Sequence, residues 1–268
     1  MTAPRVLLTA GHNRSVACEA LAELLRRDGV FVCGILVVSI LSPGRLRSLV
    51  IQRGSAATFR RMREVFRSTS VPPGQSSHES PLEGFLHRHG IKPRGLRAWC
   101  KSHSIPCWVV GDLNGQRSID IAAAQQADAV IYVGGGILRK PFLQAARRVL
   151  NAHAGPLPEV RGMNAAEWAV MLGHRQEVTV HQIDAGIDTG PSIRAFPFDA
   201  RGCSSIRELR ETAIVAGIEG LRAVVRARTL DPAPLATCSS TDLARQCFTM
   251  APALARKLEQ RLRRRLNR

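Results

Sequence analysis

The chain has 268 residues, of which 45% are hydrophobic and 22% charged, so it is long enough for one large core and globular in composition. No apolar run reaches the roughly 18 residues that span a bilayer. The N-terminus lacks the apolar stretch of a secretory signal, which predicts a cytoplasmic protein. A formal net charge of +17 leaves nucleic acid, an anionic membrane surface and phosphorylated substrates open as partners.

The first forty residues alternate between strand and helix patterns. Arg5–Ala10 is apolar and extended, a turn follows at residues 11–15, and residues 16–27 show the apolar spacing of a helix closed by Gly29. Residues 30–41 form a second apolar run whose length suits a buried strand. A strand, helix and strand at this spacing predict a parallel sheet.

Residues 42–94 interrupt the alternation. The segment is basic, and its stretch STSVPPGQSSHESP is rich in Ser, Pro and Gly, which is typical of a loop. We expect an insertion that contains one or two helices, at residues 45–67 and 82–89, around that loop.

The regular pattern then returns. Helices are predicted at residues 95–103, 118–126, 141–147 and 204–227, strands at 106–110, 129–133 and 148–152, a β-rich segment at 177–198, and a basic helix from Pro252 onward. This order predicts an α/β fold with a Rossmann-like, mostly parallel sheet and helices on both faces. We expect one domain over residues 1–230 and a basic helical tail over residues 231–268.

The seven cysteines are scattered along the chain, and none stands in a CxxC pair. Most lie beside apolar residues. This pattern favours reduced thiols packed as small hydrophobic side chains over a disulfide framework or a metal site.

A polar pair ends the strand predicted at residues 148–152. Asn151 and His153 are two residues apart, so both side chains leave the same face of a strand. They also stand at its carboxyl end, where open parallel sheets bind ligands. The pair is therefore a candidate for contacts with a ligand, although an Asn or a His at a strand end, taken singly, is usually a satisfied turn residue.

A second motif, VTVHQIDAGIDTGP, occupies residues 178–191 and contains the carboxylates Asp184 and Asp188 in a glycine-rich loop. Together with NAH at 151–153, LPEVRG at 157–162 and a following Trp, it resembles the folate-dependent formyltransferase family. That family includes the glycinamide ribonucleotide and methionyl-tRNA formyltransferases. The strong match covers about residues 134–191, and a weaker one reaches back to the first strand.

The resemblance implies transfer of a formyl group from 10-formyltetrahydrofolate, the formyl donor, to an amine. Negative charge would develop on the formyl oxygen, where Asn151 and protonated His153 would donate hydrogen bonds. Losing one such donor typically costs about 100- to 1000-fold in rate. Asp188 would pair with His153, favour its charged form and steer a water that removes the proton of the amine.

The resemblance also implies binding sites for the two substrates. Folate would contact the segment GGGILRKP and the later loop, through Gly135, Gly136, Ile137, Leu138, Arg139, Asp184 and Gly186. The family often has Pro where Arg139 stands. A phosphate of the acceptor would lie at the first turn after a strand, and the candidates for its anion are His12, Asn13, Arg14, Ser15 and Arg161.

Plainer roles remain open for several of these residues. The turn before the first helix is equally well explained as an ordinary glycine turn in which Ser15 is the helix N-cap. Arg161 suits an anchor for the Pro-rich loop as well as it suits an anion site. Asp184 and His181 either shape the loop around the pterin or hydrogen-bond its backbone, and Trp168 suits core packing.

The identity of the acceptor is inferred only by excluding other members of this family. A methionyl-tRNA formyltransferase should carry a C-terminal β-barrel, and the residues after 198 show a helical pattern instead. A glycinamide ribonucleotide enzyme would lack the insertion at 42–94, and a formyltetrahydrofolate hydrolase would begin with a regulatory domain. We therefore expect a small-molecule amine acceptor, such as a nucleotide-linked amino sugar. These three enzymes are kept as alternatives.

The basic tail raises a question of its own. In ALARKLEQRLRRRLNR a leucine recurs every four residues with arginines between, which suits either an interfacial helix on anionic lipid or packing on the main domain. The eight Phe, three Trp and one Tyr do not interleave with the basic zones as in single-strand binders, so nucleic acid, including tRNA, is not favoured as a partner.

Overall fold

The computed structural model describes residues 3–39, 79–230 and 245–266. The helix predicted at residues 45–67 lies outside these ranges, and so does the Ser- and Pro-rich loop after it up to residue 78.

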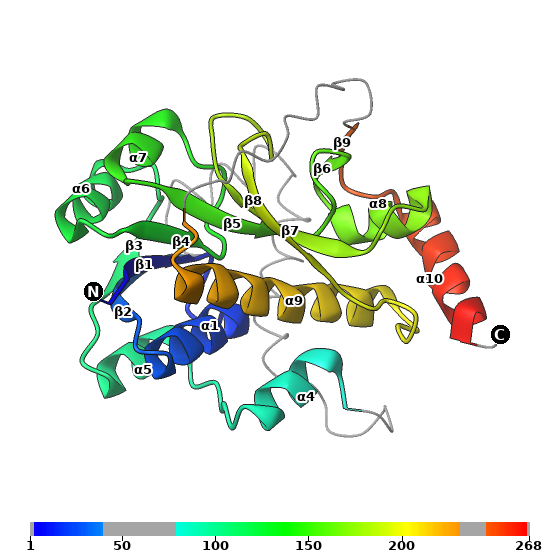
Figure 1. The fold of residues 1–268 in the computed structure, drawn as a ribbon, viewed down its shortest axis with the longest axis horizontal. Helices are drawn as coiled ribbons and strands as arrows, with labels where there is room; N and C mark the ends of the chain where they lie inside the picture. Colours follow the sequence, from blue (N-terminus) through cyan, green and yellow to red (C-terminus); the bar gives the residue numbers. More distant parts are fainter. Residues whose placement is uncertain (1–2, 40–78, 231–244, 267–268) are drawn as a thin grey trace.

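Seven strands form one sheet in the order β3-β2-β1-β4-β5-β7-β8 (Figure 1). Their bounds are β1 Arg5–Ala10, β2 Phe31–Val38, β3 Cys107–Val110, β4 Ala129–Tyr132, β5 Val149–His153, β7 Glu177–Gln182 and β8 Ser192–Pro197. Strands β3 to β5 of this order pair in parallel, whereas β7 is antiparallel to both β5 and β8. The predicted α/β fold with a mostly parallel, Rossmann-like sheet is confirmed.

Helices cover both faces of the sheet (Figure 1). Helices α1, α5 and α9 lie on one face, with α4 packed on α9, and α6 and α7 lie on the other. Their bounds are α1 Val16–Arg27, α4 Pro81–Arg88, α5 Leu96–Ser102, α6 Gln116–Gln125, α7 Lys140–Ala145 and α9 Ile206–Ala227.

The sheet is buried on both sides, as its unbroken apolar strands predict. Along β1, Val6 and Leu8 pack toward α1 and α9, while Leu7 packs toward α6 and α7. All three side chains are fully buried. The central strands therefore form the rigid base on which the loops at their carboxyl ends are held.

Most predicted elements lie within a few residues of the observed ones, and β1 and α1 coincide with their predictions. Three short elements were not predicted: β6 Val160–Gly162, α8 Ala165–Leu172 and β9 Arg245–Cys247. Strands β6 and β9 form a separate parallel pair of three residues each. A pair this short, between segments more than eighty residues apart, gives no periodic signal in the sequence.

The C-terminal helix α10, Pro252–Leu266, begins where the sequence predicted a basic helix. Leu258 and Leu262 are fully buried in a cluster with residues of α8 and α9, and Leu254 packs beside them. This part of the leucine row therefore faces the protein, which supports the packing alternative for the tail. Of the helices in the described ranges, none combines the length and the hydropathy that crossing a membrane requires.

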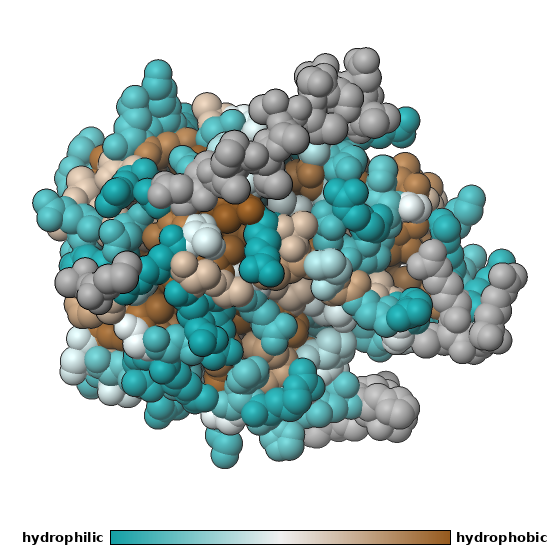
Figure 2. Space-filling model, in the orientation of Figure 1, coloured by the Kyte–Doolittle hydropathy of each residue, from teal (hydrophilic) through white to brown (hydrophobic). Residues whose placement is uncertain are grey.

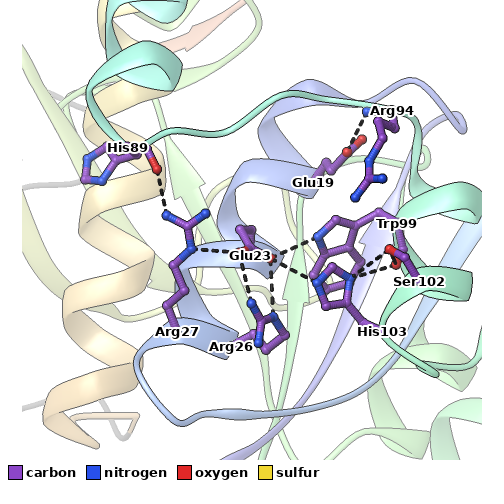
Figure 3. Close-up of polar contacts among 9 residues, drawn as sticks. All are labelled: Glu19, Glu23, Arg26, Arg27, His89, Arg94, Trp99, Ser102 and His103. Atoms are coloured by element: carbon purple, nitrogen blue, oxygen red, sulfur yellow. Dashed lines mark hydrogen bonds and ion pairs between the residues drawn. The ribbon is translucent and has the colours of Figure 1, made fainter.

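Two buried carboxylates of α1 hold the segment that precedes α5 (Figure 3). Glu19 accepts hydrogen bonds from the backbone N–H groups of Arg94, at 2.7 Å, and Gly95, at 2.8 Å. Glu23 accepts one from the indole Nε1 of Trp99, at 3.1 Å. Because these bonds satisfy carboxylates that are nearly buried, they fix the position of α5 against α1.

The arginines of α1 complete this network. Arg26 and Arg27 donate to Glu23 over 3.0 and 2.6 Å, and the ring of His103 lies 3.6 Å from the same carboxylate (Figure 3). Burial acts to raise the pKa of Glu23, but these hydrogen bonds outweigh it and lower the pKa to about 2. Glu23 is therefore ionised throughout the neutral range.

Candidate active site

The site lies at the carboxyl edge of the sheet, where the strand order reverses. Strand β1 pairs with β2 along one edge and with β4 along the other. The strand order therefore reverses between β1 and β4, which is the switch point. Loops diverge at such a point and leave a crevice for ligands. Asn151 and His153 stand beside this crevice at the end of β5, the next strand.

Asn151 and His153 leave the same face of β5, as their spacing predicted. The antiparallel neighbour β7 places His181 opposite Asn151 and Thr179 opposite His153. Thr179 is fully occupied by the chain that follows β5: its hydroxyl donates to the Gly155 carbonyl over 2.8 Å and accepts from the Leu157 N–H over 3.2 Å. The register of two strands thus gathers four polar side chains on one patch of the sheet.

Asp188 reaches this patch from the loop between β7 and β8. Its backbone has a φ of 51°, in the left-handed region, which turns the loop back over the sheet. One carboxylate oxygen, Oδ2, lies 3.3 Å from Nδ1 of His153 and accepts the Gly162 N–H over 2.8 Å. The other, Oδ1, lies 3.6 Å from Nε2 of His181. The predicted pairing of Asp188 with His153 is present in the structure.

The second nitrogen of His153 has a partner as well. Nε2 lies 2.7 Å from the backbone carbonyl of Val160, in β6. Both ring nitrogens therefore face an oxygen acceptor. A direct bond from His153 to a substrate oxygen would therefore require Nε2 to exchange the Val160 carbonyl for that oxygen.

His181 supports Asn151 from the neighbouring strand. Its side chain is 1% exposed, and burial lowers the pKa of His181 against the opposing charge of Asp188. The ring is thus held neutral, with Nδ1 donating to the Gln182 carbonyl over 3.0 Å. Its Nε2 then accepts one N–H of the Asn151 amide over 3.2 Å, which leaves the second amide N–H for another acceptor. The sequence alone left this residue between two minor roles.

A cavity of about 480 Å³ opens beside the two β5 residues. Asn151 and His153 line one part of it, and residues of α1, α8, α9 and the end of β4 line other parts. Its volume falls within the range of roughly 300–1,000 Å³ typical of ligand pockets. The polar constellation and a space for a substrate therefore adjoin each other.

The glycine triplet after β4 forms the neighbouring loop. Gly134, Gly135 and Gly136 all have positive φ, between 103° and 138°, a region that favours glycine. A Cβ at Gly135 would also collide with the side chain of Leu113. The backbone here is therefore shaped in a way that other residues cannot reproduce, which fits a loop that presents its amides to a flat ligand.

Asn114 fixes the far end of that loop and was not recognised from the sequence. Its amide donates to the carbonyl of Ile137 over 2.9 Å and accepts the N–H of Arg139 over 2.7 Å. Ile137 is consequently held with 72% of its side chain exposed, whereas Leu138 points into the core. No signal marked Asn114, since an Asn in a DLNG turn is ordinary in loops.

The remaining folate candidates lie in the loop between β7 and β8. Asp184 accepts the Gly186 N–H over 3.0 Å and the Thr189 hydroxyl over 2.6 Å. A Cβ at Gly186 would collide with Thr189, and one at Gly190 would collide with the Gln182 carbonyl. Asp184 thus stabilises the loop that carries Asp188, and a contact of either residue with folate stays a prediction.

The candidates at the first turn are partly occupied by local structure. Ser15 is the N-cap of α1 and accepts the Cys18 N–H over 3.4 Å. Asn13 accepts the backbone N–H groups of Leu96, at its carbonyl, and Arg97, at its side chain. Both residues therefore join the turn to α1 and α5, as the plainer alternative for Ser15 anticipated. Of the other two, Arg14 is exposed and His12 is half-buried.

Arg161 lies on β6 beside Gly162, and its buried Nε makes no hydrogen bond to a described residue. Trp168 packs in two apolar clusters around α8 and donates its indole N–H to the Phe248 carbonyl over 2.9 Å. Within the ranges that the structure covers, no three His, Cys, Asp or Glu side chains are arranged to hold a metal ion.

The chain thus has an α/β fold with a Rossmann-like sheet, and its Asn, His and Asp constellation lies at the carboxyl end of β5, beside the switch point. Residues 112–199 match the model of the formyl transferase family. This segment contains all three residues of the constellation. Over this third of its length the chain is similar to the formyl transferase family.

Curated relatives show the same similarity over part of the chain. The chain is 32% identical over 101 residues to the methionyl-tRNA formyltransferase of Legionella pneumophila, which covers 37% of this chain and 32% of the relative. It is 35% identical over 140 residues to the methionyl-tRNA formyltransferase of Parvibaculum lavamentivorans, which covers 49% and 41%. The chain thus matches less than half the length of each of these relatives.

Solved structures share the fold at low identity. A phosphoribosylglycinamide formyltransferase from Campylobacter jejuni superposes with a TM-score of 0.54 at 16% identity, over 84% of this chain and 97% of that one. A sugar N-formyltransferase from a Shewanella species gives a TM-score of 0.51 at 9% identity, over 99% and 89%. These likenesses establish the architecture.

Proposed function

We propose that this protein transfers a formyl group from 10-formyltetrahydrofolate to the primary amine of a small acceptor. The observation that carries the proposal is the convergence of Asn151, His153 and Asp188 beside a cavity, inside the segment that matches the formyl transferase family. Each of these residue types suits one need of acyl transfer.

The reaction requires few protein groups. The lone pair of a neutral amine attacks the formyl carbon, and the carbonyl oxygen becomes an oxyanion. The bond between the formyl carbon and N10 of the folate then breaks, with its electron pair passing to N10. The proton lost by the attacking nitrogen balances N10, so the products are a formamide and tetrahydrofolate.

Asn151 is the direct donor for the oxyanion. His181 uses one N–H of its amide and fixes its orientation, so the second N–H is available without rearrangement. A preorganised donor of this kind stabilises charge that develops only during the reaction. His153, positioned by Asp188 and by the Val160 carbonyl, donates to the same oxygen once Nε2 leaves that carbonyl.

Asp188 has a second role in the proposal. Its carboxylate is 17% exposed and binds the Gly162 N–H as well as His153, so it stays in place when the ring moves. A water held against this carboxylate would take the proton from the attacking amine.

The donor fits the loops that surround the constellation. The glycine triplet presents a backbone without side chains, and Ile137 offers an exposed apolar side chain on which a flat ring can lie. Contacts of Gly135, Gly136, Ile137, Arg139, Asp184 and Gly186 with folate belong to this proposal. Leu138 points into the core, so only its backbone is available.

Three related activities are the alternatives. The relatives include methionyl-tRNA formyltransferases, and the structural neighbours include phosphoribosylglycinamide and sugar N-formyltransferases. A formyltetrahydrofolate hydrolase would use the same donor with water as the acceptor. We favour a small amine because the cavity beside Asn151 has the volume for one.

The test is a turnover assay with 10-formyltetrahydrofolate and a panel of amines, including glycinamide ribonucleotide, a nucleotide-linked amino sugar and methionyl-tRNA. Tetrahydrofolate release and the formylated product are both measured. Amine-dependent release with a matching formamide supports the proposal. Release without any amine would favour the hydrolase, and no release under any condition would overturn the proposal.

A further inference from the structure

The cavity beside Asn151 has a wall of apolar side chains where it borders α1 and α9. Leu21 of α1 and Ala166 of α8 face it, together with Ala213, Ile214, Gly217 and Ile218 of α9. Their spacing along α9 places one stripe of small and branched residues along the cavity. Figure 2 shows hydrophobic surface in the middle of the face that α9 crosses in Figure 1, framed by hydrophilic side chains.

The charged groups of this wall neutralise each other. Arg210 is the one Arg or Lys among the described residues that line the cavity, and its Nε and Nη2 both lie 2.6 Å from Oε1 of Glu167. The same oxygen accepts the Asn164 amide over 2.9 Å. The Glu167 side chain is 3% exposed, so the ion pair with Arg210 is little screened by water on the Glu167 side.

These features of the cavity wall favour a ligand without phosphate groups. A phosphate needs N–H donors that are not already used, and the guanidinium at this wall is paired with a carboxylate. An apolar body, by contrast, gains from every apolar contact it makes with α1 and α9. The amine itself requires only the polar end of the cavity, where Asn151 and His153 stand.

On the basis of the proposed function, we infer that the acceptor is a primary amine carried by an uncharged, apolar body. The body occupies the space between α1, α8 and α9, and the nitrogen lies at the Asn151 and His153 end. The nitrogen gains the formyl carbon and loses one proton as the donor folate is released, so no further reactant is needed.

A series of linear primary amines with three to seven carbons tests this inference. Each methylene that enters the cavity should lower both the Kd, measured by calorimetry with the amine alone, and the KM by about fourfold, which corresponds to ~0.8 kcal/mol. Phosphoethanolamine, in which a phosphate replaces part of the alkyl chain, should bind more weakly than butylamine. The nucleotide-linked amino sugar should likewise turn over more slowly.

A variant localises the effect. Ile214→Asp places a carboxylate on the cavity wall at a position that is already 39% exposed, so folding should be retained. The fourfold steps should disappear in this variant. Leu172→Asp is the matched control, because Leu172 is 38% exposed and does not line the cavity.

The outcomes separate the two proposals. Chain-length-dependent binding without formamide production would overturn the proposed function and leave the ligand class intact. Formamide production with equal KM values along the series, or with a preference for the phosphorylated amines, would overturn the inference alone. Equal sensitivity of the Ile214→Asp and Leu172→Asp variants would also overturn it.

Discussion

Asn151 and His181 face each other across the antiparallel pair of β5 and β7, with the amide nitrogen 3.2 Å from Nε2 of the imidazole. Because the ring is neutral and its Nδ1 is already committed to a backbone carbonyl, Nε2 can only accept. The contact therefore fixes which way the Asn151 amide points. Mutations can therefore distinguish the role of the donor, Asn151, from that of the orienting residue, His181.

Removing the donor should abolish transfer while the protein stays folded. Asn151→Ala deletes the amide that stabilises the oxyanion, so kcat should fall about 100- to 1000-fold. His153→Ala and Asp188→Asn should have effects of similar size. His174→Ala, a change outside the constellation, is the control. Near-normal turnover in all three variants, with unchanged circular dichroism, would contradict the assignment.

His181→Phe should act through Asn151 and not on the substrate directly. The phenyl ring fills the buried space but cannot accept the amide N–H, so kcat should fall with little change in KM. His181→Gln keeps an acceptor and should restore part of the rate. If the two variants reduced kcat equally, His181 would be a packing residue only.

The same histidine predicts a pH dependence of stability. Burial lowers the pKa of His181 in the folded state below its ordinary value of 6.5, so the unfolded chain binds more protons just below that pH. The stability contributed by His181 is therefore complete above pH 6.5 and is lost as the pH falls toward the folded-state pKa. Urea unfolding at pH 7.5 and 5.5 should show a smaller difference for His181→Gln than for the unchanged protein.

Glu23 predicts a second, more acidic transition. Its pKa is lowered from 4.5 to about 2 in the folded state, so its contribution to stability is present above pH 4.5 and is lost as the pH falls toward 2. Glu23→Gln should cost ~1–3 kcal/mol at pH 7, as for other hydrogen bonds to charged groups. The substitution should also weaken the dependence of the free energy of unfolding on pH below pH 4.5. If Glu23→Gln and the unchanged protein lost stability equally below pH 4.5, other carboxylates would account for the acid transition.

Gly135→Ala tests the loop after β4. The positive φ and the clash with Leu113 mean that the loop must shift, which should cost ~1–3 kcal/mol in stability and raise the KM for the folate donor. Gly202→Ala is the matched control, because no atom lies within 4 Å of a Cβ built there and its φ is not positive. A KM for the folate that is unchanged in Gly135→Ala would argue against this loop as the donor site.

Local sequence pattern determined the elements that are long and regular. The apolar run of β1 and the amphipathic spacing of α1 were predicted with their observed bounds, because an alternation with period 2 or 3.6 depends only on neighbours in the chain. The spacing of Asn151 and His153 likewise determined that they share a face of one strand. The motif around Asp188 placed it with them by resemblance to a family.

Only the tertiary structure decided how these side chains are used. The bond from His153 to the Val160 carbonyl depends on β6, and β6 is held by β9, which lies some eighty residues further along the chain. The side chain of Asn13 likewise depends on a distant segment. It accepts the Arg97 N–H in the first turn of α5, and that helix is held against α1 by Glu19 and Glu23. A hydrogen bond between distant segments forms only after the chain has folded, so no local pattern records it. Folding also buried Leu258 and Leu262, which the sequence alone could have placed on a lipid surface or on the protein.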